Sequence, residues 1–356
     1  MNEQDLNRLL DGSPEIQADR AFQEKVKKEM RRTLIRRTVI TLLIILLAGT
    51  ILFFSTSALL NCICYDPADE NGTFLLSCTG GVQHEFHVLL EDAVAILCPG
   101  TRLQVLDRPE ATGFGHYELA VQTENAFLHT MQGALARYTF RLSPAGLDTD
   151  HAPLVCIANC FANPTAPDRV PAGIGTEALM PELQKLPQSA RLDIALSLES
   201  ALTAQQTADL MRAYPDITFH FLALNGQEAA FYPGVSGGLP LDSFRSEVFT
   251  QEAAKKYPNY VLPEREALTG EVLQQSLCSR LQLLLDHPDF LRLLEPVFPE
   301  IATQKNLTGR LEQAKTEFTC YGLWITAGTQ DLQKLLQDYP CTQILVNDVK
   351  VSRYAR

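Results

Sequence analysis

The sequence lacks charged residues in one stretch and basic residues in another. No charged side chain occurs in residues 38–60, although 20% of the 356 residues are charged. No Lys or Arg occurs in residues 61–101. We also find no glycine-rich phosphate loop and no paired-carboxylate signature, so nothing in the sequence points to nucleotide-dependent chemistry or to carboxylate acid–base catalysis. We therefore expect a protein that is not an enzyme and that needs no cofactor.

The uncharged stretch reads TVITLLIILLAGTILFFSTSALL and is long enough to cross a membrane. Its 23 residues would form a helix of about 34 Å, against a hydrocarbon core of about 30 Å. A helix satisfies its own backbone hydrogen bonds, as a segment inside lipid must. A cleaved signal peptide has an apolar region of only about 7 to 15 residues behind a short basic lead. We therefore predict a transmembrane helix at residues 38–60 that stays in place as an anchor.

The charges around this helix predict its orientation. Residues 20–37 contain eight Lys and Arg side chains against two Glu, and the next basic residue after the helix is Arg102. Basic flanks stay on the cytoplasmic side of a single-pass helix. We therefore expect a cell-membrane protein with residues 1–37 as a cytoplasmic tail and residues 61–356 outside the cytoplasm.

The part beyond the helix has the composition of a folded protein. The chain continues for 296 residues after position 60, enough for one large or two ordinary domains. Net charge is −12 overall, and because residues 1–37 contribute +2, the remainder carries −14. A surface of this sign favours solubility and argues against nucleic acid or anionic lipid as its partner. The expected partners are the lipid bilayer around the helix and an extracytoplasmic ligand or protein that the sequence does not identify.

The start of the predicted tail has a small apolar face. Leu6, Leu9 and Leu10 fall on one side of a short helix within the acidic residues 1–19, and the sequence DGSP at residues 11–14 ends this pattern. Anchoring in a membrane does not explain these leucines. We therefore predict that they contact a partner protein.

The rest of the predicted tail has an amphipathic pattern. Apolar residues recur every four positions among the basic side chains, at Phe22, Val26, Met30 and Leu34. This spacing predicts a helix that leads into the membrane, and anionic headgroups alone would account for its Lys and Arg residues. The partner-binding surface that we predict consists of Leu6, Leu9, Leu10, Phe22 and Val26.

Residues 61–175 are expected to form a mixed α/β region. Residues 87–97 have a helical pattern that the sequence CPG at 98–100 ends. Three short runs with alternating apolar residues predict strands, at residues 101–106, 116–121 and 136–142. Residues 163–175 are rich in Pro, Gly and Ala, which indicates a domain boundary or a long surface loop.

The last half of the chain contains two similar β-α-β patterns. In the first, a strand at residues 191–198 precedes a helix that a capping box of Thr203 and Gln206 begins, and a strand at 217–224 follows. The second has a strand at 320–326, a helix at 329–338 and a strand at 342–349. Tyr-Pro ends both helices, at Tyr214 and Tyr339. Helices are also expected at residues 270–286 and 288–294, between the two patterns.

These patterns predict the fold class. We expect an α+β protein with a single N-terminal transmembrane helix, a mixed region beyond it, and a C-terminal half that is a duplicated β-α-β, or ferredoxin-like, arrangement. Both helices of the duplication would lie on one face of a four-stranded sheet.

Three parts of the chain resemble the sigma factor regulator family of Gram-positive bacteria, with its N-terminal and C-terminal domains. They are the basic tail with one anchor, the run RLDIALSLESALTAQQTADLMRAYPDITFHFLAL, and the run TCYGLWITAGTQDLQKLLQDYPCTQILVNDV. The chain departs from the family pattern at Leu198, where members tend to have Phe, and at His220, where they tend to have Trp. The resemblance implies a membrane-bound anti-sigma factor that holds a sigma factor through residues 1–37 and senses the envelope through its outer part, with residues 61–175 as a mixed region and residues 176–356 as the sigma-regulator-like domain.

Two features leave alternatives open. Residues 234–238 match the G-x-S-x-G pattern that surrounds the nucleophile of serine hydrolases, but prolines at 233 and 240 flank Ser236 where that motif needs a strand and a helix. We interpret these residues as a loop, and His220 as a hydrogen-bonded or solvent-facing histidine. The alternatives are an exported serine hydrolase built on Ser236 and an anchored extracytoplasmic protein without a regulatory role.

Metal and disulfide patterns are weak. His84 and His87, and the group of Asp148, Asp150 and His151, lack further ligands at a recognisable spacing, so we predict no metal site. The nine cysteines are an odd number and cannot all pair with one another. We interpret most of them as small buried apolar side chains.

Overall fold

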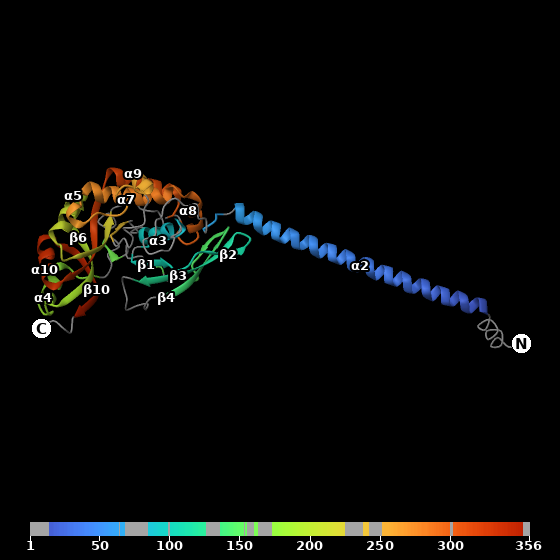
Figure 1. The fold of residues 1–356 in the computed structure, drawn as a ribbon. Coiled ribbons are helices and arrows are strands. Elements are labelled where there is room, and N and C mark those ends of the chain that lie inside the picture. Colours follow the sequence, from blue (N-terminus) through green and yellow to red (C-terminus); the bar gives the residue numbers. More distant parts are fainter. Residues whose placement is uncertain are drawn as a thin grey trace. The chain divides into compact units, whose positions relative to one another are not determined.

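The computed structural model of the chain describes eleven parts of it, which are residues 14–63, 65–67, 85–98, 100–125, 136–152, 154, 160–162, 173–224, 238–241, 251–299 and 302–351. The chain divides into two compact units, an N-terminal unit of residues 1–60 and a C-terminal unit of residues 61–356. Figure 1 shows a long helix in the first, and helices with sheets in the second. The expected mixture of α and β structure with one long apolar N-terminal helix is confirmed. The division at residue 175 stays a prediction, and residues 163–172 lie outside the described residues.

The N-terminal helix is longer than the predicted span. Helix α2 runs without a break over Pro14–Ile63, 50 residues, so the amphipathic and the apolar patterns belong to one helix. Pro14 is its first residue, a position that proline favours because its fixed φ suits a helix and its missing N–H costs nothing there. Pro14, the last residue of the DGSP sequence, is therefore the first residue of α2, and residues 11–13 lie outside the described residues.

The first sheet of the C-terminal unit contains the three predicted strands and two further short ones. Its strands are β1 (Thr101–Val105), β2 (Glu110–Gly113), β3 (His116–Asn125), β4 (Ala136–Ser143) and β5 (Gly146–Asp148). They pair in the order β1-β3-β4-β5, β2 pairs with β3, and every pair is antiparallel. The predicted helix is α3 (Glu85–Leu97), which contacts β1 and buries Leu89 and Leu90 completely.

The short strands of this sheet depend on tight turns. Gly146 has φ of 125°, and a Cβ atom there would lie 2.4 Å from Cγ of Pro296. Only glycine fits this position, because a side chain would be strained by the backbone and would also clash. Strands of three and four residues show too little alternation to be predicted from sequence.

The second sheet of the C-terminal unit contains both β-α-β patterns. Its strands are β6 (Ala190–Thr203), β7 (Thr218–Leu224), β8 (Gly238–Pro240), β9 (Thr319–Gly328) and β10 (Cys341–Val351). They pair antiparallel in the order β10-β6-β9-β7-β8. The first strand of each pattern therefore lies between the two strands of the other pattern.

The two connecting helices lie side by side on this sheet. They are α5 (Ala204–Ala213) and α10 (Thr329–Asp338), and both contact β6 and β9. The predicted capping box is present, since Thr203 accepts a hydrogen bond from the backbone N–H of Gln206, whose side chain accepts one from Thr203. At the other end of α5, the hydroxyl of Tyr214 donates to Asp338 at 2.5 Å, which joins α5 to α10.

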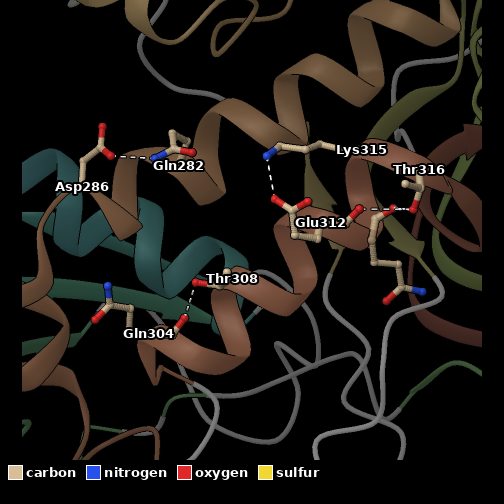
Figure 2. A network of polar contacts seen from close by, with 8 residues as sticks. Gln282, Asp286, Gln304, Thr308, Glu312, Lys315 and Thr316 are labelled. Carbon is tan, nitrogen blue, oxygen red and sulfur yellow. Dashed lines mark hydrogen bonds and ion pairs between the residues drawn. The ribbon is translucent and has the colours of Figure 1, made fainter.

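Further helices complete the C-terminal unit. They are α4 (Thr176–Leu183), α6 (Gln251–Lys256), the 3-10 helix η2 (Arg265–Ala267), α7 (Gly270–Leu285), α8 (Pro288–Leu294) and α9 (Gln304–Thr316). Helices α7 and α8 match the two that the sequence predicts. Figure 2 shows hydrogen bonds within α9, from Thr308 to the carbonyl of Gln304 at 2.7 Å and from Lys315 to Glu312 at 2.7 Å.

Candidate partner-binding helix

The N-terminal half of α2 displays apolar side chains to its surroundings. Phe22 is 65% exposed and Val26 is 39% exposed, and Met30 and Leu34 follow them at four-residue intervals and are exposed as well. The basic residues from Lys25 to Arg37 are also exposed, and Arg32 forms an ion pair with Glu29 at 3.4 Å. Of the predicted partner-binding surface, Phe22 and Val26 thus occupy one exposed face of α2. Leu6, Leu9 and Leu10 lie outside the described residues.

The C-terminal half of α2 is compatible with lipid. It belongs to one helix segment, Phe22–Leu60, that is long and apolar enough to cross a membrane, with a mean hydropathy of 2.5 in its most apolar window and none of that window buried. Thr38, Thr50 and Thr56 donate their hydroxyls to the carbonyl four residues earlier, at 2.9, 2.8 and 2.7 Å. Each of these three hydroxyls is therefore satisfied within the helix, as apolar surroundings require.

A buried ion pair joins α3 to α7 in the core of the C-terminal unit. Asp92 and Arg280 form a charge-assisted hydrogen bond, and both side chains are almost completely buried. The guanidinium also lies over the ring of Tyr260, 4.4 Å from its centroid. Burial raises the pKa of Asp92, and the positive charge of Arg280 opposes this change. An isolated buried charge is strongly unfavourable, so each member of the pair depends on the other.

A second polar network lies where α6 meets the end of α7. Asp286 accepts hydrogen bonds from Tyr257, Lys256 and Gln282 at 2.7, 2.7 and 2.6 Å, and Figure 2 shows the contact with Gln282. Burial alone would raise the pKa of Asp286, but these hydrogen bonds outweigh burial and lower it. Burial and the contact with Asp286 raise the pKa of Tyr257 to about 12. Asp286 is therefore an ionised carboxylate that fixes the end of α7.

The only tryptophan of the chain, Trp324, lies on the face of the second sheet opposite to α5 and α10. Its indole N–H donates to Asp193 at 2.6 Å, and Asn347 donates to the other oxygen of that carboxylate at 2.5 Å. The ring of His220 lies 4.8 Å from that of Trp324, and its Nε2 is 2.8 Å from the hydroxyl of Thr326. The interpretation of His220 as a hydrogen-bonded residue is confirmed.

The other sequence motifs show no assembled chemistry in the described residues. Ser236 and His84 lie outside them, and His87 is buried in α3. Asp148 accepts a hydrogen bond from the backbone N–H of Asp150 at 3.0 Å, in a turn where Asp150 and His151 have positive φ. Among the described side chains, no three His, Cys, Asp or Glu residues are grouped as metal ligands would be.

Cysteines with described side chains include three thiols within the C-terminal unit that form no disulfide. They are Cys278, Cys320 and Cys341. Burial raises the pKa of Cys320 and of Cys341 to about 12, so both are protonated at neutral pH and unreactive. For these two cysteines the interpretation as small buried apolar side chains is confirmed.

The buried ion pair and the Asp286 network were not predicted, because the sequence does not tell which helices meet. One signal was available for the ion pair, since Asp92 and Arg280 each interrupt an apolar helical pattern. Charged residues at such positions usually have a buried partner. Comparison with protein-family models, with curated proteins and with solved structures found no match to this chain.

Proposed function

We propose that the protein is a membrane-anchored anti-sigma factor, whose cytoplasmic tail binds a sigma factor and whose C-terminal unit senses the envelope. The observation that carries this proposal is the continuity of α2, in which an exposed basic and apolar segment leads directly into an exposed apolar span. The basic residues set the orientation with the tail inside the cell. A partner bound at Phe22 and Val26 would be held at the membrane, away from polymerase on the chromosome.

The identity of the partner rests on the resemblance of the tail and of the two β-α-β runs to the sigma factor regulator family. The duplicated, ferredoxin-like arrangement belongs to the same proposal. The pairing order β10-β6-β9-β7 supports it, and so does the similar backbone at the ends of the two helices, where Tyr214 has φ −120° and ψ 70° and Tyr339 has φ −131° and ψ 86°. A copied unit would keep the tyrosine and the proline that follows it at both places.

Release of the sigma factor needs a step that the helix alone does not supply. A signal shifts an equilibrium only if it binds two states differently, and a lone transmembrane helix offers no evident second state. We therefore expect release by cleavage of the chain or by a partner subunit. Location at the membrane lets modest affinity suffice for inhibition, because the anchor already keeps the sigma factor away from its promoters.

The proposed function is tested by removing the leucine segment from the tail. A variant that lacks residues 1–19 keeps α2 from Arg20 onward, and so keeps the anchor. We expect transcription of the genes that depend on the sigma factor bound by the tail to rise as much as in a full deletion. Unchanged transcription, with no protein co-purifying with the intact tail, would contradict the proposal.

A further inference from the structure

Strand β10 forms one edge of the second sheet. On its outer side, the described residues supply a single bridge, between Ile174 and Ile344 near the start of the strand. Beyond α2, the large exposed apolar side chains of the described residues are Ile174, Val349 and Val351. All three lie on or beside this edge. An edge strand with exposed apolar side chains is a template for pairing with another strand.

The pairing of β10 with β6 determines the faces on which its last residues lie. Val349 is opposite Leu192, and Val351 is opposite Ala190. Directly opposed residues of antiparallel strands project to the same face, so the two valines belong to the face that carries the core. Asp348 and Lys350 belong to the other face, and the Lys350 side chain is 75% exposed.

Within the chain itself, these two charges have unfavourable neighbours. Asp348 is directly opposite Asp193, and Lys350 is directly opposite Arg191. Like charges that face each other across a sheet are destabilising. The contact that the structure does provide, between Lys350 and Asp348 at 3.7 Å, is a long one along the same strand.

A second copy of β10 would place an opposite charge directly across from each of these two residues. In an antiparallel pair related by a two-fold axis, each residue faces the residue equally far on the other side of the central position. With Val349 at the centre, Val349 faces its own copy, and Asp348 faces Lys350 of the other copy twice. A centre at Asp348 or at Lys350 would instead place two like charges against each other. This register therefore pairs each of the two charges with an opposite one and places Val349 against its own copy, while Val351 faces Asn347 of the other copy.

We propose that two copies of this chain associate through β10, antiparallel and centred on Val349, so that their second sheets join into one continuous sheet. An edge lysine usually protects a strand against such pairing. Here Asp348 lies two residues before Lys350, so that in the proposed pair each Lys350 faces a carboxylate of the other copy. The lysine therefore disfavours pairing with other strands but not with a second β10. The proposal does not depend on the function of the tail.

Cysteine cross-linking of the full-length chain in membranes tests the register. In Val349→Cys the two introduced thiols would lie on facing residues, with Cα atoms about 4.5–5.5 Å apart, and a short bis-thiosulfonate reagent should join them. In the matched control Val351→Cys, the introduced thiols would be four residue steps apart, about 13 Å, too far for the same reagent. We expect a covalent dimer in Val349→Cys beyond the level in the unsubstituted chain, and no such increase in Val351→Cys.

Charge reversal in the Val349→Cys variant distinguishes a loss of association between two copies from a loss of folding of one copy. Asp348→Lys and Lys350→Asp each create two like-charge contacts between copies, and each gives the chain's own sheet a favourable neighbour, Asp193 or Arg191. We expect each single reversal to lower the dimer yield about fivefold and the double reversal to restore it. Absence of a Val349→Cys dimer, equal cross-linking of Val351→Cys, or a double reversal no better than the single ones would each overturn the proposal.

Discussion

The buried charges of the C-terminal unit are the residues at which one substitution has the largest expected effect. Arg280 is held between Asp92 and the ring of Tyr260, so removing it leaves a buried carboxylate without its counter-charge. We expect Arg280→Met to lower the free energy of unfolding by about 3–5 kcal/mol. Denaturation of the detergent-solubilised full chain, followed by the fluorescence of the single tryptophan Trp324, measures the change.

A double substitution provides the control for this prediction. Asp92→Leu combined with Arg280→Met removes both charges and keeps apolar volume in the core, so it should recover most of the stability that Arg280→Met loses. A stability of Arg280→Met within about 0.5 kcal/mol of the unsubstituted chain would show that the pair does not hold α3 against α7.

Asp286 gives a prediction about pH. Its pKa is lowered from 3.8 in the folded state, so the folded state binds the proton less readily than the unfolded state does. The resulting stability is fully present above pH 3.8 and is lost as pH falls through the lower folded-state pKa. Asp286→Asn should therefore be less stable by about 1–2 kcal/mol at pH 7, with the difference shrinking below pH 4.

Trp324 fluorescence in denaturation series between pH 3 and pH 7 measures this difference, because acid effects at other sites cancel between the two proteins. A constant difference across the whole range would mean that the ionised form of Asp286 has no special role.

Among the elements, the sequence patterns predicted the helices and strands in which buried side chains recur at a regular spacing. Helices α5 and α10 and the strands around them appear where the periodicity and the Tyr-Pro stops place them. Helix α9 was missed, although it buries Leu307, Leu311 and Ala314 at helical spacing, because Gly309 and a mostly polar sequence obscure three apolar positions. The pairing of distant strands, such as β6 with β9, has no local signal in the sequence.

The arrangement of α5 and α10 on the second sheet predicts which of their side chains are essential. Leu210 and Leu335 are completely buried, so Leu210→Asp and Leu335→Asp would each place a carboxylate between helix and sheet. We expect each to cost more than about 4 kcal/mol or to prevent folding. Gln330→Asp, at an exposed position in the first turn of α10, is the matched control and should have almost no effect.

Resistance of the full chain to limited proteolysis in detergent measures these three variants side by side. Equal resistance of all three would contradict the placement of the two leucines between the helices and the sheet.

At the scale of the whole molecule, the apolar span was predictable because charge and length alone define it. The predicted tail is a different case. Phe22 and Val26 form an exposed face of α2, but the sequence of a chain does not specify which protein binds to such a face. The identity of the proposed partner therefore rests on the resemblance, whereas the proposed membrane anchor rests on the hydropathy of the helix and on the basic residues that flank it.

The topology of the chain in intact cells decides whether residues 1–37 can meet a cytoplasmic partner. A membrane-impermeant thiol reagent is applied to variants with a new cysteine at Asp5 or at Asp150, and labelling is compared with that of the unsubstituted chain and with that of permeabilised cells. We predict that Asp150→Cys gains label in intact cells and that Asp5→Cys gains it only after permeabilisation. Labelling of Asp5→Cys but not of Asp150→Cys in intact cells would invert the orientation and contradict the account of a cytoplasmic tail that binds a sigma factor.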